Sequence, residues 1–342
     1  MHNILQELTS WSLQVAEALG YHVQNPTLLM VSGDASFRQY YRLECQPKSL
    51  IIVFSPPDKE DNRSFIAIAK AWHAQGLHVP QVHQTDESRG FMALSDLGSR
   101  LLLPDLNDSS VDQYYQQALR DLDQLAATTP PDDYPLPTYD ADKLRSEMQL
   151  FVQWFCTTHL SLTELSFPLE SLYELLIDSA VAQPQVVVHR DYHARNLMLD
   201  GDQLGIIDFQ DAVIGPITYD PVSLLKDCYI AWPRSRVEAW VKAYNNQSRQ
   251  PIDNVMQAFD FMGLQRHIKV AGIFARLYHR DKKAGYLNDL PLVLAYLVDA
   301  AQRYSSTQGF ADWLKASVLP RYFELTPSHQ PVYEQHLETM SS

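Results

Sequence analysis

Oxygen-bearing side chains that could serve one reaction gather in a short stretch near the middle of the chain. Asp191 and Asn196 follow an apolar run at residues 186–188, and Asp208 follows a later apolar run. Carboxylate and amide oxygens are the ligands that Mg²⁺ prefers, and a carboxylate can also accept the proton of a hydroxyl group. We therefore expect metal-binding and proton-accepting groups here, provided that the fold brings these side chains together.

A β-hairpin is the element that would bring them together. Two apolar runs flank a turn of Asp, Gly and Gln at residues 200–203, which is typical of a hairpin. If Leu199 pairs with Leu204, then Asn196 and Asp208 come to the same end of the hairpin, next to the loop that precedes it. The pattern predicts proximity and leaves open which face each side chain takes.

Such a set is suited to phosphoryl transfer from a nucleoside triphosphate. A carboxylate and a phosphate repel each other by about 4 kcal/mol per unit-charge pair, at about 4 Å and an effective dielectric near 20, unless a cation lies between them. Mg²⁺ held by Asn196 and Asp208 would fill that role. Asp191 would accept the proton of the attacking hydroxyl group and orient it in line. We therefore predict ATP and Mg²⁺ as cofactors.

The first hundred residues predict a small β-rich lobe. Short apolar runs alternate with turn residues, and an initial helix stops at Gly20, a natural helix C-terminus. The expected elements are helices at residues 4–19 and 62–76 and strands at residues 28–31, 40–43, 50–54 and 91–94.

The rest of the chain is predominantly helical in its spacing. A helix that begins after Asp140 carries its apolar residues on one stripe, namely Leu144, Met148, Phe151 and Phe155. We therefore expect an α+β, bilobal chain, with a β-rich lobe at residues 1–97 and a helical lobe at residues 98–342. Ligands usually bind in the cleft between such lobes.

Composition and charge limit the class of protein. The 27 basic and 41 acidic residues give a net charge of −14, which argues against a nucleic-acid partner. No run approaches the roughly 18 apolar residues of a membrane span, and the N-terminus lacks a signal-peptide pattern. Cys45, Cys156 and Cys228 are far apart, as free thiols in a reducing compartment would be. We expect a cytoplasmic protein whose oligomeric state the sequence leaves open.

Two turns are candidates for nucleotide binding. Ser32, Gly33 and Ser36 lie between the first two strands, where backbone N–H groups could cover phosphates, although a plain hairpin turn is the alternative. Ser95 and Leu97 lie between the two lobes, where a hinge could offer backbone groups to adenine, and a plain linker is the alternative.

The central stretch carries a resemblance to a known family. The pattern His-x-Asp-x-His-x-x-Asn, followed by Ile-Asp-Phe, is matched by His189, Asp191, His193, Asn196 and Asp208. This run resembles the catalytic loop of the aminoglycoside phosphotransferase-like branch of the protein-kinase fold. The resemblance implies a protein-kinase-like fold and a kinase of small molecules that bear a hydroxyl group. It also implies that the lobe at residues 1–97 binds the nucleotide and that the lobe at residues 98–342 carries catalysis and the substrate.

A closer likeness extends over most of the chain. Segments at residues 36–42, 56–61, 95–98, 190–193, 208–212 and 266–270 are similar to a bacterial subfamily of amino-sugar kinases. The likeness implies phosphorylation of the anomeric C1 hydroxyl of N-acetylmuramate or N-acetylglucosamine during peptidoglycan recycling. Two alternatives stay open. One is a kinase of another small alcohol, such as an aminoglycoside, choline or homoserine, and the other is a non-catalytic, nucleotide-binding pseudokinase.

Two further positions are compared with the kinase pattern. The fold usually places a Lys on its third strand to hold the phosphates, but residues 50–54 contain none, and Lys59 and Glu60 follow only later. This departure keeps the pseudokinase alternative open. A later Asp of the family corresponds to Asp220, which we expect to cap a helix that begins at Pro221.

A basic stripe supplies the last candidates. Arg266, Lys269, Arg276 and Arg280 are spaced by three, seven and four residues, so they lie along one helical face. Such a stripe is either a solvated surface or an electropositive wall near an anionic substrate. The lactyl carboxylate of N-acetylmuramate would be such an anion. We therefore name Arg276, together with His193, as candidate substrate-binding residues.

Overall fold

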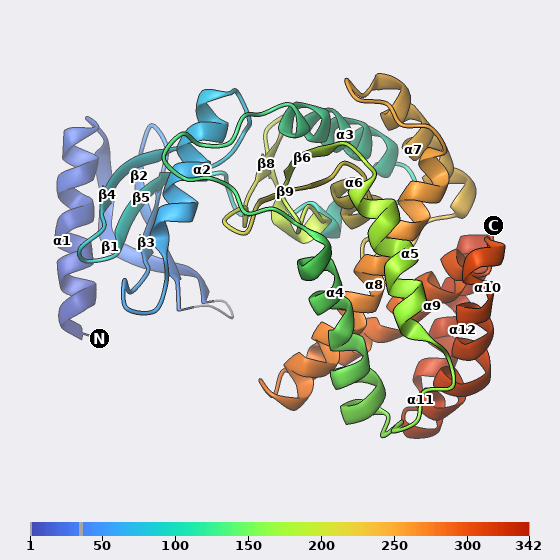
Figure 1. The fold of residues 1–342 in the computed structure, drawn as a ribbon. Helices are drawn as coiled ribbons and strands as arrows, with labels where there is room; N and C mark the ends of the chain where they lie inside the picture. Colours follow the sequence, from blue (N-terminus) through green and yellow to red (C-terminus); the bar gives the residue numbers. More distant parts are fainter. Residues whose placement is uncertain (1, 34–36, 342) are drawn as a thin grey trace. The chain divides into compact units, whose positions relative to one another are not determined.

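The structure is a computed structural model that describes residues 2–33 and 37–341 (Figure 1). The chain divides into two compact units. The first comprises Met1–Asn107, Thr128–Leu136 and Arg195–Asp211, and the second Asp108–Ala127, Pro137–Ala194 and Ala212–Ser342. The boundary between a nucleotide-binding and a catalytic lobe, expected near residue 97, stays a prediction. Residues Arg195–Asp211 belong to the first unit, together with the N-terminal residues.

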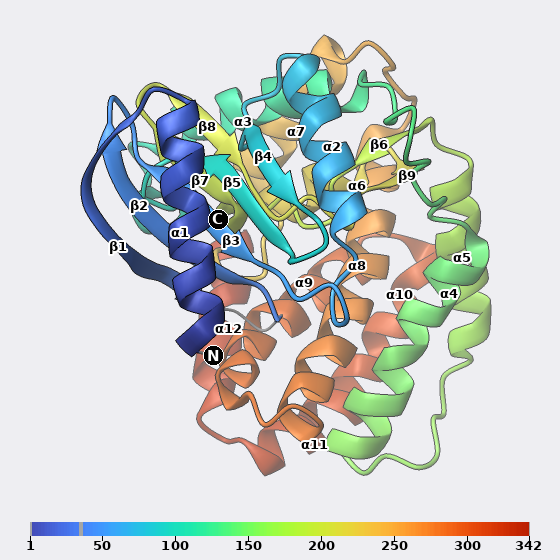
Figure 2. The ribbon, with the colours of Figure 1, turned by 90° about the vertical axis from the view of Figure 1, so that its left-hand side faces the viewer.

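The first unit is built on a five-stranded antiparallel sheet. Its strands are β1 (His22–Gly33), β2 (Gln39–Gln46), β3 (Leu50–Phe54), β4 (Val82–Asp86) and β5 (Phe91–Ser95), in the order β1-β2-β3-β5-β4. Two helices, α1 (His2–Ala18) and α2 (Asn62–Ala74), accompany them. Figure 2 shows α1 lying along the sheet, where Leu8, Trp11 and Val15 pack against the buried side chains of β2 and β3.

The expected helices and four of the five strands are therefore confirmed. β4 is the strand that the sequence analysis missed. Its sequence, Val-His-Gln-Thr-Asp, contains one aliphatic residue, and none of its side chains is fully buried. A polar edge strand of this kind lacks the apolar alternation on which strand prediction depends.

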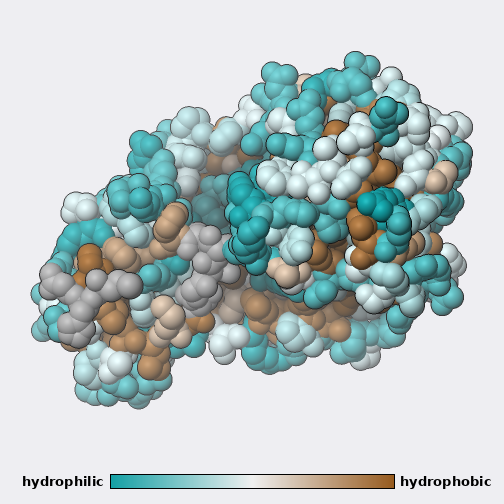
Figure 3. Space-filling view, turned by 90° about the horizontal axis from the view of Figure 1, so that it is seen from below, coloured by the Kyte–Doolittle hydropathy of each residue, from teal (hydrophilic) through white to brown (hydrophobic). Residues whose placement is uncertain are grey.

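The other edge strand of the sheet, β1, exposes apolar side chains. Leu29, Met30 and Val31 are exposed, as is Phe37 just before β2, and brown hydrophobic residues appear on this unit in Figure 3. The pairing of β1 with β2 is interrupted by three register shifts. Such bulges twist an edge strand and reduce its ability to pair with another sheet.

The predicted hairpin is present in the first unit with the predicted register. β7 (Leu197–Asp200) pairs with β8 (Gln203–Ile206) so that Leu199 lies opposite Leu204 and Met198 opposite Gly205. The Ile207 N–H donates to the Asn196 carbonyl oxygen (3.1 Å), which extends the pairing toward Asp208.

The second unit is mainly helical. Its helices are α3 (Val111–Ala126), α4 (Ala141–Leu150), α5 (Leu169–Val181), α6 (Tyr219–Leu225), α7 (Arg234–Gln247), α8 (Val255–His279), α9 (Leu290–Ala301), α10 (Ser305–Trp313), α11 (Leu319–Leu325) and α12 (His329–Ser341), with π-helical segments at Phe151–His159 and Leu314–Val318. The strands β6 (Gln185–Val188) and β9 (Val213–Pro216) form a small antiparallel sheet. Short 3-10 turns occupy Leu103–Asp105, Ala194–Asn196 and Ala284–Asp289 across the chain.

The core of this unit is formed around α8 and α9. Every residue of α9 is buried, and α8 packs against α4, α5, α6 and the π-helical segment that follows α4. The predicted stripe is confirmed over α4 and the π-helical segment that follows it, because Leu144, Met148, Phe151 and Phe155 are all fully buried. Asp140 accepts a hydrogen bond from the Lys143 N–H at the start of α4. Within the described residues, no helix combines the length and the apolar character needed to cross a membrane.

Gly272 allows α8 to approach α4 closely, and replacing it by Ala should destabilise the protein. An added Cβ would lie 2.5 Å from the Phe151 backbone nitrogen and 2.6 Å from the Leu150 carbonyl oxygen. Because backbone atoms cannot move aside singly, we expect Gly272→Ala to lower the free energy of unfolding by about 1–3 kcal/mol. Gly285→Ala is the control, since an added Cβ there meets nothing within 4 Å. Equal urea midpoints for the two variants would contradict the prediction.

Candidate active site

The loop after β6 carries Asp191 and is fixed by a buried carboxylate. Asp220 accepts hydrogen bonds from the backbone N–H groups of His189 (2.6 Å) and Arg190 (2.9 Å). Burial raises the pKa of Asp220 to about 6, although these hydrogen bonds favour the ionised form. The expectation that Asp220 caps a helix beginning at Pro221 is wrong. α6 already includes Asp220, whose side chain holds the loop instead of the helix end.

Arg190 adopts a left-handed backbone conformation, with φ of 76°. For a residue other than Gly this conformation costs about 1–2 kcal/mol. The Arg190 carbonyl oxygen accepts hydrogen bonds from Arg266 (2.8 Å) and Ser223 (3.3 Å), and the Arg190 guanidinium donates to Glu147 (2.6 Å). The surrounding side chains therefore impose a backbone conformation that is otherwise disfavoured, as is common at active sites.

The two histidines of the motif lie on either side of Asp191. The Asp191 N–H donates to His189 Nδ1 (3.2 Å), and the His193 N–H donates to the Asp191 carbonyl oxygen (2.9 Å). His189 is completely buried and therefore shapes the loop. His193 is half-buried, and its ring meets the Tyr229 ring edge-on at 5.4 Å. A substrate contact by His193 stays a prediction.

The Asp191 carboxylate is accessible and lies next to a buried cation. Its side chain is 44% exposed, while Arg266 is 5% exposed and places its guanidinium 3.6 Å from Asp191 Oδ1. Partial desolvation opposes ionisation of Asp191, but the positive charges of Arg266 and Lys269 outweigh it and lower the pKa below the ordinary Asp value. Asp191 is therefore a carboxylate at neutral pH, able to accept a proton from a group that reaches it.

Behind this carboxylate lies a buried ion cluster centred on Glu147. Glu147 accepts hydrogen bonds from Lys269 (2.9 Å), Arg190 (2.6 Å) and the Tyr139 hydroxyl. Desolvation opposes ionisation of Glu147, but the charges of Lys269 and Arg190 outweigh it and lower its pKa. Lys269 and Arg266 both donate to the Tyr219 hydroxyl, at 3.1 and 3.2 Å. Two carboxylates and three cations therefore form one continuous network.

The residues of the basic stripe on α8 become more exposed toward the carboxyl end of the helix. Arg266 and Lys269 are buried, so the expectation of a solvated surface is wrong for these two residues. Arg276 is half-buried, and Arg280 is exposed and pairs with Asp281 (2.8 Å). The buried part of the stripe pairs with the carboxylates of Asp191 and Glu147, and a contact of the stripe with an anionic substrate stays a prediction.

Asn196 and Asp208, the two predicted metal ligands, both belong to the first unit and lie close together. Asn196 Nδ2 lies 3.4 Å from Asp208 Oδ2 at the open end of the β7–β8 hairpin, and Gln210 Nε2 donates to Asp208 Oδ1 (2.9 Å). Asp208 is exposed and, like Arg190, has a left-handed backbone, with φ of 65°. The hairpin register puts both side chains at this end, as the sequence analysis expected.

This pair fits a hard divalent cation better than a transition metal. In the part of the chain that the structure describes, no three His, Cys, Asp or Glu side chains are grouped as metal ligands. Mg²⁺ needs no such group, because it is bound by one or two carboxylates plus water and substrate phosphate oxygens. One exposed carboxylate and one amide, Asp208 and Asn196, are consistent with that requirement.

The predicted nucleotide-binding positions are only partly described. Ser36 lies outside the described residues, and Ser32 and Gly33 end β1 opposite Tyr40 and Gln39. These three residues stay predictions.

At the predicted hinge, the two candidates differ in the hydrogen bonds available to a ligand. The Ser95 N–H donates to the Gln81 carbonyl oxygen (2.9 Å), and Ser95 Oγ accepts from the Gln81 N–H (2.9 Å). Leu97 is buried, and its backbone N–H and C=O make no hydrogen bond to any of residues 2–33 and 37–341. The Leu97 backbone is therefore the better candidate for a ligand contact.

An ion pair that the sequence analysis missed fixes this segment. Arg42 binds both carboxylate oxygens of Asp96, at 2.5 and 3.0 Å, and donates to the Gly98 carbonyl oxygen (2.8 Å). Fifty-four residues separate Arg42 from Asp96, so no local pattern connects them. Glu147 was missed as well, although a signal existed, since it lies three residues after Leu144 on an otherwise apolar face of α4.

The third strand, which lacks the usual Lys, is β3 (Leu50–Phe54), and Lys59 does not lie on it. Lys59 is on the loop before α2, is half-exposed, and pairs with Asp58 (3.6 Å). A buried cation, Arg38, lies close by and interacts with Glu60 (3.9 Å) and with the Ser55 hydroxyl (3.4 Å).

Comparisons with known proteins agree with this geometry. The profile of the phosphotransferase enzyme family matches residues 27–259. The N-acetylmuramate/N-acetylglucosamine kinase of Pseudomonas putida is 41% identical over 315 residues, covering 87% of this chain and 92% of that protein. The protein of the same name from Neisseria meningitidis is 36% identical over 294 residues, covering 81% of this chain and 86% of that protein.

Solved structures confirm the expected fold. A choline kinase from Streptococcus pneumoniae has a TM-score of 0.56 at 12% identity, covering 84% of this chain and 96% of that one. A macrolide 2'-phosphotransferase from Brachybacterium faecium has a TM-score of 0.55 at 14% identity, covering 85% and 98%. The α+β, protein-kinase-like fold with a β-rich and a helical part is thus the fold of this chain.

Proposed function

The chain belongs to the phosphotransferase enzyme family, and we propose that it is an ATP- and Mg²⁺-dependent kinase of N-acetylated amino sugars. In this proposal it phosphorylates the anomeric C1 hydroxyl of N-acetylmuramate or N-acetylglucosamine in the cytoplasm, during peptidoglycan recycling. The observation that carries the proposal is the accessible, ionised carboxylate of Asp191, held beside Arg266. The choice of acceptor is supported by the names of relatives that are 36–41% identical.

In the proposed mechanism Asp191 is the catalytic residue. The acceptor hydroxyl oxygen attacks the terminal phosphorus of ATP, its proton passes to Asp191 Oδ, and ADP leaves. Arg266 keeps Asp191 ionised before the reaction, and His189 and Asp220 hold the loop that carries it. The acceptor is thereby oriented as well as activated.

The remaining assignments concern the nucleotide. Asn196 and Asp208 would hold Mg²⁺, which when bound neutralises the phosphate charge. Leu97, two residues after Ser95, would offer its backbone groups to adenine, and the turn with Ser32, Gly33 and Ser36 would cover the phosphates.

The test of the proposed function is incubation of the purified protein with Mg-ATP and a panel of acceptors. The panel contains the two amino sugars, their 1-deoxy analogues, an aminoglycoside, choline and homoserine. We expect ADP release with the two amino sugars alone, and a phosphorus NMR signal of a C1 phosphate. Phosphate on a 1-deoxy sugar would exclude the anomeric assignment. Turnover of another alcohol would favour the second kinase interpretation, and nucleotide binding without turnover of any acceptor would favour a pseudokinase.

The Mg²⁺ requirement offers a separate prediction on Gln210. Its amide donates to Asp208 Oδ1 (2.9 Å) and orients the carboxylate. Loss of such an orienting partner usually weakens metal binding about 10- to 100-fold. We therefore expect Gln210→Leu to raise the Mg²⁺ concentration for half-maximal activity by that factor, with kcat nearly restored at saturation. A Mg²⁺ titration checks this, and an unchanged half-saturation point would argue against Asp208 as a ligand.

A further inference from the structure

Arg276 is a half-buried cation without an acidic partner. Its Nε atom is buried and makes no hydrogen bond, and no carboxylate lies within ion-pair distance of its guanidinium among residues 2–33 and 37–341. The next cation on the same face, Arg280, pairs with Asp281. An arginine left unpaired is unexpected in a chain with 41 acidic and 27 basic residues.

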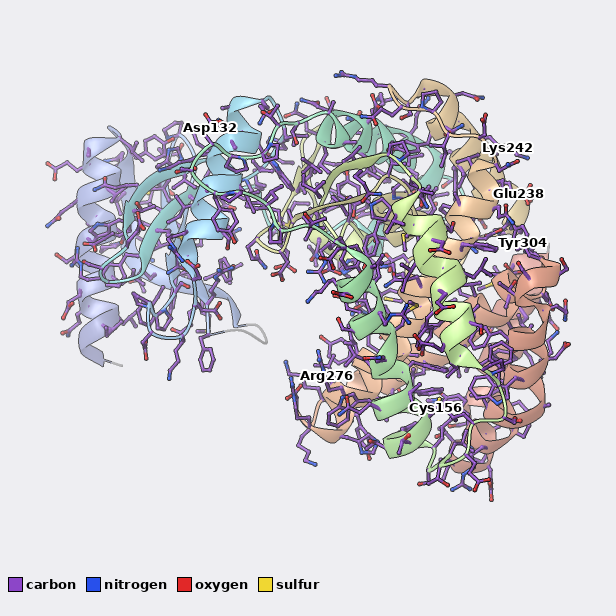
Figure 4. The ribbon with its side chains drawn as sticks, in the orientation of Figure 1. Asp132, Cys156, Glu238, Lys242, Arg276 and Tyr304 are labelled. Carbon is purple, nitrogen blue, oxygen red and sulfur yellow. The ribbon has the colours of Figure 1, made fainter. Side chains whose placement is uncertain are left out.

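The position of Arg276 relates it to the reacting groups. It lies toward the carboxyl end of α8, seven residues after Lys269 (Figure 4). Seven residues are almost two helical turns, so Arg276 is nearly in line with Lys269 and about 10 Å further along the helix axis. Side chains of a helix generally lean toward its N-terminus, which from Arg276 is the direction of Lys269 and Arg266, and the Arg266 guanidinium lies 3.6 Å from Asp191 Oδ1.

The electrostatic environment of Arg276 favours an incoming anion. Desolvation and the like charge of Arg280 lower its pKa from the usual Arg value, and they outweigh the opposing charges of Asp281 and Glu147, neither of which forms an ion pair with it. Glu147, a buried carboxylate whose charge acts on Arg276, is already bonded to Lys269 and Arg190. A carboxylate brought by a ligand would supply the missing countercharge, and a guanidinium can bind it through two parallel hydrogen bonds.

We propose that Arg276 binds the carboxylate of an acidic acceptor sugar and is the residue that favours such a sugar over its neutral counterpart. This inference rests on the proposed function. N-acetylmuramate differs from N-acetylglucosamine by a lactyl ether at C3, which carries a carboxylate, while the C1 hydroxyl is the reacting group. A carboxylate that the sugar carries away from its C1 hydroxyl would thus meet a cation on the helical face that leads from Arg266 to Arg276.

The experiment compares wild type with Arg276→Gln, using each sugar in turn under saturating Mg-ATP. We expect kcat/KM for N-acetylmuramate to fall about 10- to 100-fold, which is the effect of losing one charge-assisted hydrogen-bonded pair. The loss should appear in KM, because the interaction is made equally in the ground state and the transition state. For N-acetylglucosamine, kcat/KM should change by less than about twofold, and Arg276→Lys should recover part of the lost preference.

Arg280→Gln is the matched control, since it removes a cation one turn away that already has a partner, and it should leave both sugars unaffected. An equal loss on both sugars in Arg276→Gln would mean a structural role and overturn the inference, as would unchanged kinetics. If the wild-type protein phosphorylates neither sugar, the proposed function itself fails, and the role of Arg276 fails with it.

Discussion

Replacing Asp191 by Asn is expected to lower kcat about 10³-fold while the protein stays folded and binds nucleotide. General base catalysis by a positioned side chain contributes roughly 10²- to 10⁴-fold, and Asn cannot accept the proton. The loop should keep its geometry, because the bonds that fix it are made by Asp220, Glu147 and Arg266 to the backbone and side chain of Arg190. Steady-state kinetics with saturating Mg-ATP and sugar measure the loss, and calorimetry measures nucleotide affinity.

Asp202→Asn is the control for this variant, because Asp202 is an exposed residue of the β7–β8 turn. It should retain full activity. Undiminished turnover in Asp191→Asn would remove Asp191 from the mechanism. A loss of turnover accompanied by a lower unfolding midpoint would instead assign Asp191 a role in folding of the loop.

The elements that the sequence predicts well are those determined by neighbouring residues. The hairpin register follows from a tight turn between apolar runs, so Leu199 opposite Leu204 could be predicted without any knowledge of the rest of the chain. The stripe on α4 follows from helical spacing in the same way. Asn196 and Asp208 meet because that hairpin carries them, which made half of the candidate site predictable.

The other half depends on residues that are distant in the sequence. Arg266 approaches Asp191 from α8, and Glu147 approaches Arg190 from α4, although Glu147 and Arg190 are 43 positions apart. Helical spacing predicts that Arg266 and Arg276 share a face, but it cannot predict what covers that face. Only the tertiary structure shows that Arg266 and Lys269 are buried and paired with carboxylates, whereas Arg276 has no such partner among the described residues.

The error at Asp220 has a comparable origin. An Asp before a Pro is typical of a helix N-terminus, and the sequence offered no competing use for its side chain. In the fold, two backbone N–H groups of the loop after β6 donate to that carboxylate, and α6 begins at Tyr219, two residues before Pro221. A tertiary requirement thus overrode a local capping preference.

Glu147→Gln is expected to be the most destabilising of the proposed variants, lowering the free energy of unfolding by about 3–5 kcal/mol. The Glu147 side chain is 9% exposed and is the shared partner of Lys269 and Arg190. Breaking a buried ion pair leaves its cations desolvated without a countercharge, and losses of this size are typical. Urea unfolding of the two proteins measures the difference. Glu324→Gln, which removes an exposed partner of Arg321, should change stability by less than about 1 kcal/mol.

The pH dependence separates this electrostatic effect from a simple loss of packing. Because the pKa of Glu147 is lowered on folding, its ionised form stabilises the native state at every pH above the ordinary Glu range. That contribution is lost as the pH falls through the lowered pKa, so the difference between wild type and Glu147→Gln should shrink in acid. A difference independent of pH would mean that Glu147 acts through shape alone. Since Glu147 also fixes Arg190, whose strained backbone leads directly into Asp191, we expect the variant to lose turnover even under conditions where it is still folded.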